Sequence, residues 1–150
     1  MPFLVIGLSH RSSPVEVRER FAFSDAALPG ALEELRRATG ADGAVILSTC
    51  NRVEIYAVTG SPDREAAAAL RQFLIDYHRW EEPPGGEFYC HSGARGLEHL
   101  FRVACGLDSM VLGETEILGQ LKKAYQLALR HKHTGGQLNR IFQRAFNVAK

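Results

Sequence analysis

Two apolar runs joined by a short polar segment constrain the fold of this chain more than any other feature. Residues 44–47 form a continuous apolar run typical of a buried strand, and residues 53–58 alternate in polarity like a second strand. The intervening residues 48–52 read Ser-Thr-Cys-Asn-Arg and predict a reversal between the two strands. This reversal would hold Cys50 at the edge of a sheet, with hydrogen-bond donors on both sides.

Further strands and helices are predicted around this pair. Residues 3–8 and 88–90 read as strands. Helical spacing of apolar residues is found in the remaining segments, at 15–21, 24–40, 63–80 and 92–105. The order of elements matches the split β-α-β arrangement, with one additional helix in its first crossover. We therefore predict an α+β fold: a four-stranded, mostly antiparallel, ferredoxin-like sheet with helices on one face.

The C-terminal part of the chain reads as helical throughout. Apolar residues recur at helical spacing over 117–128 and again over 138–150, where no stop signal is found. We therefore expect the protein to be longer than this chain. The 150 residues themselves are expected to form one domain, with an α+β part at 1–106 and a helical part at 107–150.

Charge is distributed unevenly along the chain. Residues 117–150 carry seven basic residues and no acid, whereas residues 1–116 carry 11 basic and 17 acidic residues. A basic segment of this kind is found in proteins that bind RNA. It is equally typical of helices whose acidic neighbours lie elsewhere in the fold, and the sequence leaves both interpretations open.

The remaining composition indicates a cytoplasmic protein. No apolar run is long enough for a transmembrane helix, and the N-terminus has no features of a secretory signal. The three cysteines are an odd number at wide spacing, which argues against a disulfide framework. We expect a reducing compartment and a free thiol.

Cys50 is the first candidate for chemistry. A cysteine reacts as its thiolate, which a nearby cation stabilises. Arg52 is one such cation and is also suited to binding a carboxylate, while Thr49 and Asn51 are suited to orienting a carbonyl group. The alternative is that Cys50 is a small, inert apolar residue, as isolated cysteines commonly are.

His99 is the second candidate. It lies on the predicted helix 92–105, on the side of Arg95 and Arg102 and away from the apolar stripe. It is either an ordinary surface histidine or a general acid that faces the thiol across a cleft.

The segment that leads into the C-terminal helices is the third candidate. In this segment, residues 107–116 with Gln120 one turn further on, the polar side chains have two possible roles. The acids either interact favourably with a helix N-terminus, or the polar residues together form one wall of a ligand site. Acids in such a wall would hold the ammonium group of an amino-acid substrate. The residues of this candidate wall are Ser109, Glu114, Glu116 and Gln120.

Two other kinds of site are disfavoured. Cys50, Cys90, His91, His99 and Cys105 lack the close spacing of zinc ligands, so we predict no metal. No glycine-rich phosphate-binding motif is found either, so a nucleotide cofactor would require a domain outside this chain.

The motifs of this chain resemble those of the N-terminal catalytic domain of glutamyl-tRNA reductase, the enzyme that begins the five-carbon route to tetrapyrroles. The likeness extends over nearly all 150 residues, and several ordered motifs are more specific than any one of them. The matching segments are GLSHR (7–11), PVEVRE (14–19), STCNRVEIY (48–56), HLFRVA (99–104), GLDSMVLGE (106–114) and ILGQ (117–120).

The resemblance implies a mechanism. Cys50 would attack the ester of glutamyl-tRNA and form a glutamyl thioester, which NADPH, bound by a domain absent from this chain, would reduce to glutamate 1-semialdehyde. His99 matches the family's activity-supporting histidine. The positions that match the family's substrate-binding residues are Thr49, Asn51, Arg52, Ser109, Glu114, Thr115, Glu116 and Gln120.

The resemblance also implies partners. We expect glutamyl-tRNA as substrate, a homodimer of the full-length protein, no membrane contact, and contact with glutamate 1-semialdehyde aminomutase. The chain departs from the family at Glu116, where glutamine is expected, which replaces a donor-acceptor amide by an anion. The alternatives are a non-catalytic RNA-binding α+β module and a structural domain stabilised by zinc.

Overall fold

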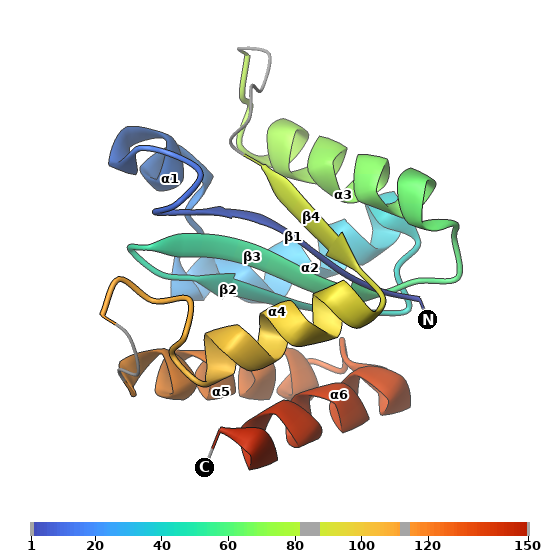
Figure 1. The fold of residues 1–150 in the computed structure, drawn as a ribbon. Helices are drawn as coiled ribbons and strands as arrows, with labels where there is room; N and C mark the ends of the chain where they lie inside the picture. Colours follow the sequence, from blue (N-terminus) through green and yellow to red (C-terminus); the bar gives the residue numbers. More distant parts are fainter. Residues whose placement is uncertain (1, 82–87, 112–114, 150) are drawn as a thin grey trace.

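The computed structural model describes residues 2–81, 88–111 and 115–149 and contains strands and helices in the predicted order (Figure 1). Its elements are β1 (Phe3–Ser9), α1 (Val15–Phe21), a 3-10 turn (Asp25–Ala27), α2 (Leu28–Thr39), β2 (Gly43–Ser48), β3 (Arg52–Val58), α3 (Asp63–Tyr77), β4 (Tyr89–Ser92), α4 (Ala94–Ala104), α5 (Glu116–Arg130) and α6 (Gly135–Val148). No helix in these ranges is long and apolar enough to span a membrane.

The strands form one antiparallel sheet in the order β2-β3-β1-β4. The β2–β3 hairpin pairs Ser48 with Val53, so the reversal carrying Cys50 is short, as predicted. On the other side of β3, Ser9 of β1 lies opposite Arg52 and Gly7 lies opposite Glu54. This is the strand order of the split β-α-β arrangement, and the predicted fold class is confirmed.

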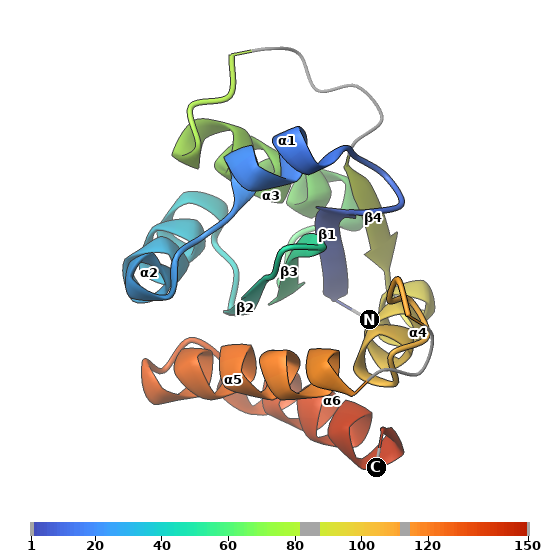
Figure 2. The same ribbon diagram turned by 90° about the vertical axis from the view of Figure 1, so that its left-hand side faces the viewer.

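Helices cover both faces of the sheet, whereas the prediction placed them on one face. Figure 2 shows α2 and α3 on one face and α5 and α6 on the other, with α4 beside them. Every residue of β1 and β3 is therefore buried, including the polar positions of β3 that would face solvent in a sheet covered on one side only. The apolar stripes of the C-terminal helices are the physical reason, because they need an apolar surface to cover.

The C-terminal helices share one hydrophobic core with the sheet. Phe142 of α6 stacks on Tyr125 of α5, with ring centroids 5.2 Å apart, and meets Tyr56 of β3 edge-on at 5.5 Å. These ring contacts fix the helices over the face of the sheet to which Tyr56 and, two residues earlier, Glu54 belong.

Gly43 at the start of β2 is expected to tolerate no side chain. A Cβ there would lie 2.1 Å from the carbonyl oxygen of Thr134, in the α5–α6 connection. Because backbone atoms cannot move aside cheaply, Gly43→Ala should lower the free energy of unfolding by about 1–3 kcal/mol in urea titrations. The control is Gly30→Ala in α2, where no atom lies within 4 Å of the added Cβ. It should raise stability by about 0.5–1 kcal/mol, and equal effects at both positions would contradict this account.

Candidate active site

The turn that carries Cys50 is closed by its own residues. The backbone N–H of Thr49 donates to the carbonyl oxygen of Arg52 at 2.8 Å. The Thr49 hydroxyl accepts from the N–H groups of Asn51 and Arg52 at 3.1 and 3.2 Å. Thr49 therefore builds the turn, which leaves Cys50 exposed at its tip.

Two neighbouring segments hold this turn from outside. The N–H of His10, which follows β1, donates to the carbonyl oxygen of Asn51 at 2.8 Å. Arg18 of α1 donates through Nε to the carbonyl oxygen of Cys50 at 3.3 Å. The main chain around Cys50 is thus bonded to the residue that follows β1 and to helix α1.

A cavity of about 280 Å³ opens beside Cys50, between the turn and the segment that leads into α5. Its lining brings together residues that are far apart in the sequence: Thr49, Cys50, Asn51, Arg52, Ser109, Met110, Val111, Glu116, Ile117 and Gln120. Seven of these were predicted as site residues. The sequence analysis missed the apolar members Met110, Val111 and Ile117, which ordinary helix and loop patterns do not distinguish.

Three of the ten predicted site residues are not found among the residues of this lining: Thr115, Glu114 and His99, the last of which is described below. Thr115 is exposed and lies outside it. Glu114 falls outside the residues that the structure describes. Glu116, the departure from the expected glutamine, does line the cavity and places a carboxylate in its wall.

Arg52 is the buried base of the cavity and not a free cation, because only 1% of its surface is exposed. Its Nη2 donates to the carbonyl oxygen of Asp108 at 2.6 Å and lies 3.0 Å from the Asp108 carboxylate, while Nη1 lies 3.4 Å from Glu54. Burial lowers the pKa of Arg52, but the charge of Glu54 and the smaller contributions of Tyr56, Tyr89 and Asp108 together outweigh burial, and the net shift is upward. Arg52 thereby ties the segment that begins at Asp108 to the sheet.

Glu54 lies at the centre of a buried polar network. Its carboxylate accepts from Arg52, the hydroxyls of Tyr56 and Tyr89, and Nε2 of His99, and none of its surface is exposed. Burial raises the pKa of Glu54, but the hydrogen bond and charge of His99, followed by the charge of Arg52, outweigh it and lower the pKa to about 2.

A glycine in β1 makes room for the buried Glu54 side chain. A Cβ on Gly7, opposite Glu54 in β1, would lie 2.9 Å from Cγ of Glu54 and 2.2 Å from the carbonyl oxygen of Val53. Glycine is therefore needed where β1 passes the buried carboxylate. Glu54 was not predicted as a functional residue, and its only signal in the sequence is an acid inside an otherwise apolar strand.

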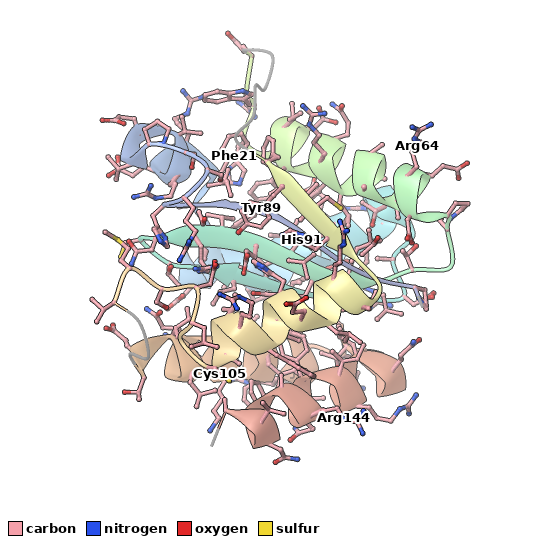
Figure 3. All side chains as sticks on the ribbon, in the orientation of Figure 1. Phe21, Arg64, Tyr89, His91, Cys105 and Arg144 are labelled. Atoms are coloured by element: carbon pink, nitrogen blue, oxygen red, sulfur yellow. The ribbon has the colours of Figure 1, made fainter. Side chains whose placement is uncertain are left out.

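His99 lies outside the lining of the Cys50 cavity and is also not an exposed surface residue. Its side chain is only 11% exposed, its Nε2 contacts Glu54, and it is not among the residues that line the Cys50 cavity. Its ring lies 4.8 Å from that of His91, which Figure 3 shows on β4 beside Tyr89. Because Arg52 binds the same carboxylate, His99 is linked to the cavity through Glu54 and Arg52.

The other two cysteines lie away from this cavity. Cys90 is on β4, where partial burial raises the pKa of its thiol, and Cys105 follows α4 (Figure 3). Within the described residues no three histidine, cysteine or acidic side chains gather into a group that could hold a metal ion.

Comparison with known proteins identifies the family. A family model described as the N-terminal domain of glutamyl-tRNAGlu reductase matches residues 6–150. The chain belongs to the glutamyl-tRNA reductase family. It is 49% identical over 151 residues to the glutamyl-tRNA reductase of Syntrophotalea carbinolica and 50% identical over 150 residues to that of Stenotrophomonas maltophilia. All of this chain is covered in both comparisons, but only 34% and 33% of the two relatives.

A solved glutamyl-tRNA reductase has the same fold. The structure from Methanopyrus kandleri matches with a TM-score of 0.81 and 34% sequence identity, over 97% of this chain and 33% of that chain. The chain thus spans about a third of the glutamyl-tRNA reductases that it matches. The chain therefore has the fold of the family's N-terminal domain.

Proposed function

We propose that this chain carries out the acyl-transfer half of glutamyl-tRNA reduction, with Cys50 as nucleophile. The observation that carries the proposal is the cavity of about 280 Å³ that joins an exposed thiol to the polar residues of a second, distant segment. An inert cysteine has no need of such a cavity. The family supports the substrate, because the matched relatives are named for glutamyl-tRNA.

The proposed step forms one bond and breaks one. The sulfur of Cys50, having lost its proton, attacks the ester carbonyl carbon of glutamyl-tRNA, and the carbon–oxygen bond to the terminal ribose then breaks. The ribose oxygen takes up a proton as free tRNA leaves, and the glutamyl group remains on Cys50 as a thioester. In the full-length reductase NADPH would supply hydride to this thioester. The chain has no glycine-rich dinucleotide motif, so we expect it to stop at the thioester or to hydrolyse it slowly.

The cavity wall suggests how the glutamyl group is held. Glu116 provides a carboxylate for the α-ammonium group, and Gln120, one turn further along α5, provides an amide. Arg52 contributes the positive charge expected for a carboxylate ligand, but it shares that charge with Glu54 and Asp108. We therefore assign recognition to the whole wall, which also includes Asn51 and Ser109.

Incubation with glutamyl-tRNA labelled in the glutamyl group tests this function directly. The chain should retain label after denaturation, and neutral hydroxylamine should release it, because hydroxylamine cleaves thioesters. Glutamine attached to the same tRNA, which replaces only the side-chain carboxylate by an amide, should label the chain much more slowly. Absence of label with both substrates, at tRNA concentrations that saturate binding, would overturn the proposal.

A non-catalytic RNA-binding module remains the second candidate, because α5 and α6 carry basic residues and no acid apart from Glu116. Part of that charge is balanced within the fold, since Lys123 lies 2.9 Å from Asp25. A binding module predicts no preferential alkylation of Cys50 over Cys90. The homodimer, the aminomutase contact and the cytoplasmic location stay predictions.

A further inference from the structure

Three arginines surround the Cys50 turn, and they differ in their partners. Arg52 and Arg11 both lie near the carboxylate of Asp108, at 3.0 and 3.4 Å. Within the described residues, no carboxylate is paired with Arg18, even though α1 also contains Glu16 and Glu19. The positive charges of Arg52 and Arg11 are therefore opposed locally, whereas that of Arg18 is not.

Arg18 is held directly against the nucleophile's own backbone. Its Nε donates to the carbonyl oxygen of Cys50 at 3.3 Å, and its Nη1 donates to the carbonyl oxygen of Ser13 at 2.6 Å. Two bonds from one planar guanidinium fix its position more firmly than one flexible contact would. The positive charge of Arg18 therefore has a fixed position beside the turn.

The helix that carries Arg18 is anchored independently of the active site. Phe21, at the end of α1, is buried, and its ring lies 5.4 Å from that of His78 and 5.2 Å from that of Trp80. Figure 3 shows Phe21 between α1 and the end of α3. These contacts involve no atom of the Cys50 turn. Helix α1 is therefore held in place by its own packing, and Arg18 extends from it to the turn.

The remaining ionisable group at the turn does not supply a second charge. The N–H of His10 binds the carbonyl oxygen of Asn51, and the pKa of His10 is lowered, first by burial and then by the charges of Arg52 and Arg11. Burial and the neighbouring arginines therefore disfavour the charged imidazole. Among the three arginines at the turn, Arg18 is the one that pairs with no carboxylate within the described residues, whereas Glu116 places a carboxylate in the wall of the cavity beside Cys50.

We propose that Arg18 is a positioning residue for Cys50, which fixes the turn through the Cys50 carbonyl oxygen and places an unopposed positive charge beside the thiol. This inference rests on the proposed role of Cys50. The charge would stabilise the negative charge that develops when the sulfur attacks an ester carbonyl. The sequence analysis assigned this function to Arg52, whose charge the fold instead uses to hold Glu54 and Asp108.

Charge-selective alkylation tests the proposal without any substrate. Rates at Cys50 are measured by peptide mass spectrometry with iodoacetate, which is anionic, and with iodoacetamide, which is neutral and of similar size. In Arg18→Gln the ratio of the iodoacetate rate to the iodoacetamide rate should fall about fivefold, as expected for one unit charge close to the thiol. Arg18→Lys should keep the ratio within about twofold, because it keeps the charge.

Controls separate this effect from misfolding and from general charge. Arg20→Gln removes a charge from the same helix, at a residue that lies over Trp80, and should leave the ratio unchanged. An unchanged ratio in folded Arg18→Gln, or an equal fall in Arg20→Gln, would overturn the proposal. If the ratio falls as expected but the wild-type chain accepts no glutamyl label, the proposed function fails and the assignment of the charge to Arg18 stands.

Discussion

Replacing Cys50 by serine should abolish the glutamyl adduct, so that label from glutamyl-tRNA falls to the level seen without protein. Serine keeps the shape of the side chain, but its hydroxyl is a far weaker nucleophile unless an adjacent base activates it. Among the described residues, no histidine lines the cavity that takes up the substrate in our proposal, and Nε2 of His99 is bonded to Glu54. The measurement is retention of label after denaturation.

Cys90→Ser is the matched control for this experiment. Cys90 is also exposed, but it lies on β4 and does not line the Cys50 cavity. The variant should accept label at the wild-type rate. Equal labelling of Cys50→Ser and the wild-type chain would remove Cys50 from the mechanism, even if the chain still bound tRNA.

Glu54→Gln should be the most destabilising conservative substitution in the site. It removes one charge from a completely buried group while keeping its size. Arg52 then stays buried with Asp108 as its one remaining carboxylate partner among the residues that the structure describes. Breaking a buried ion pair from one side typically costs about 3–5 kcal/mol of the free energy of unfolding. Chemical unfolding at pH 7 measures this loss.

The same variant makes a prediction about pH. The pKa of Glu54 is about 2 in the folded chain, below its ordinary value of 4.5. A carboxylate with a lowered pKa contributes stability that is complete above its unfolded pKa and is lost as the pH falls towards the folded pKa. The stability difference between wild type and Glu54→Gln should therefore shrink as the pH is lowered from about 5 towards 2.

Asp25→Asn provides the control for both measurements. Asp25 also pairs with a base, Lys123, but both side chains are more than two-thirds exposed, at 74% and 71%. Exposed pairs contribute less than about 1 kcal/mol, so this variant should change little at any pH. A loss at Asp25 as large as that at Glu54, or a Glu54 effect that does not depend on pH, would contradict the proposed buried network.

Much of this architecture is predictable because it depends on local patterns. The reversal at 48–52 is predicted correctly because an apolar run, polar turn residues and an alternating run are all close in sequence. Helix α1 begins and ends at the predicted residues, since the apolar residues of 15–21 are spaced helically. Three residues of the candidate wall, Ser109, Glu116 and Gln120, line the cavity beside Cys50, while their role in binding a ligand stays a prediction.

The interpretation of single polar residues was less successful, because it depended on which surfaces become covered. Glu54 and His99 lie on elements that read as partly solvent-facing, and in isolation each would be exposed. Packing of α4 against the sheet removes both from solvent and leaves them as each other's partners. Similarly, Arg52 reads as a free cation until Asp108 and Glu54 are brought to it.

The sequence by itself therefore determined the α+β class, the position of Cys50 on a tight turn, and the family to which the chain belongs. Each of these depends on residues that are neighbours along the chain. Only the tertiary structure decided that helices cover both faces of the sheet. It also decided which arginine at the turn is paired: Arg52 forms ion pairs with Glu54 and Asp108, whereas Arg18 has no carboxylate partner among the described residues. The net charge at a site depends on all the charged groups that folding brings close to it. It therefore cannot be predicted from residues that are neighbours in the sequence.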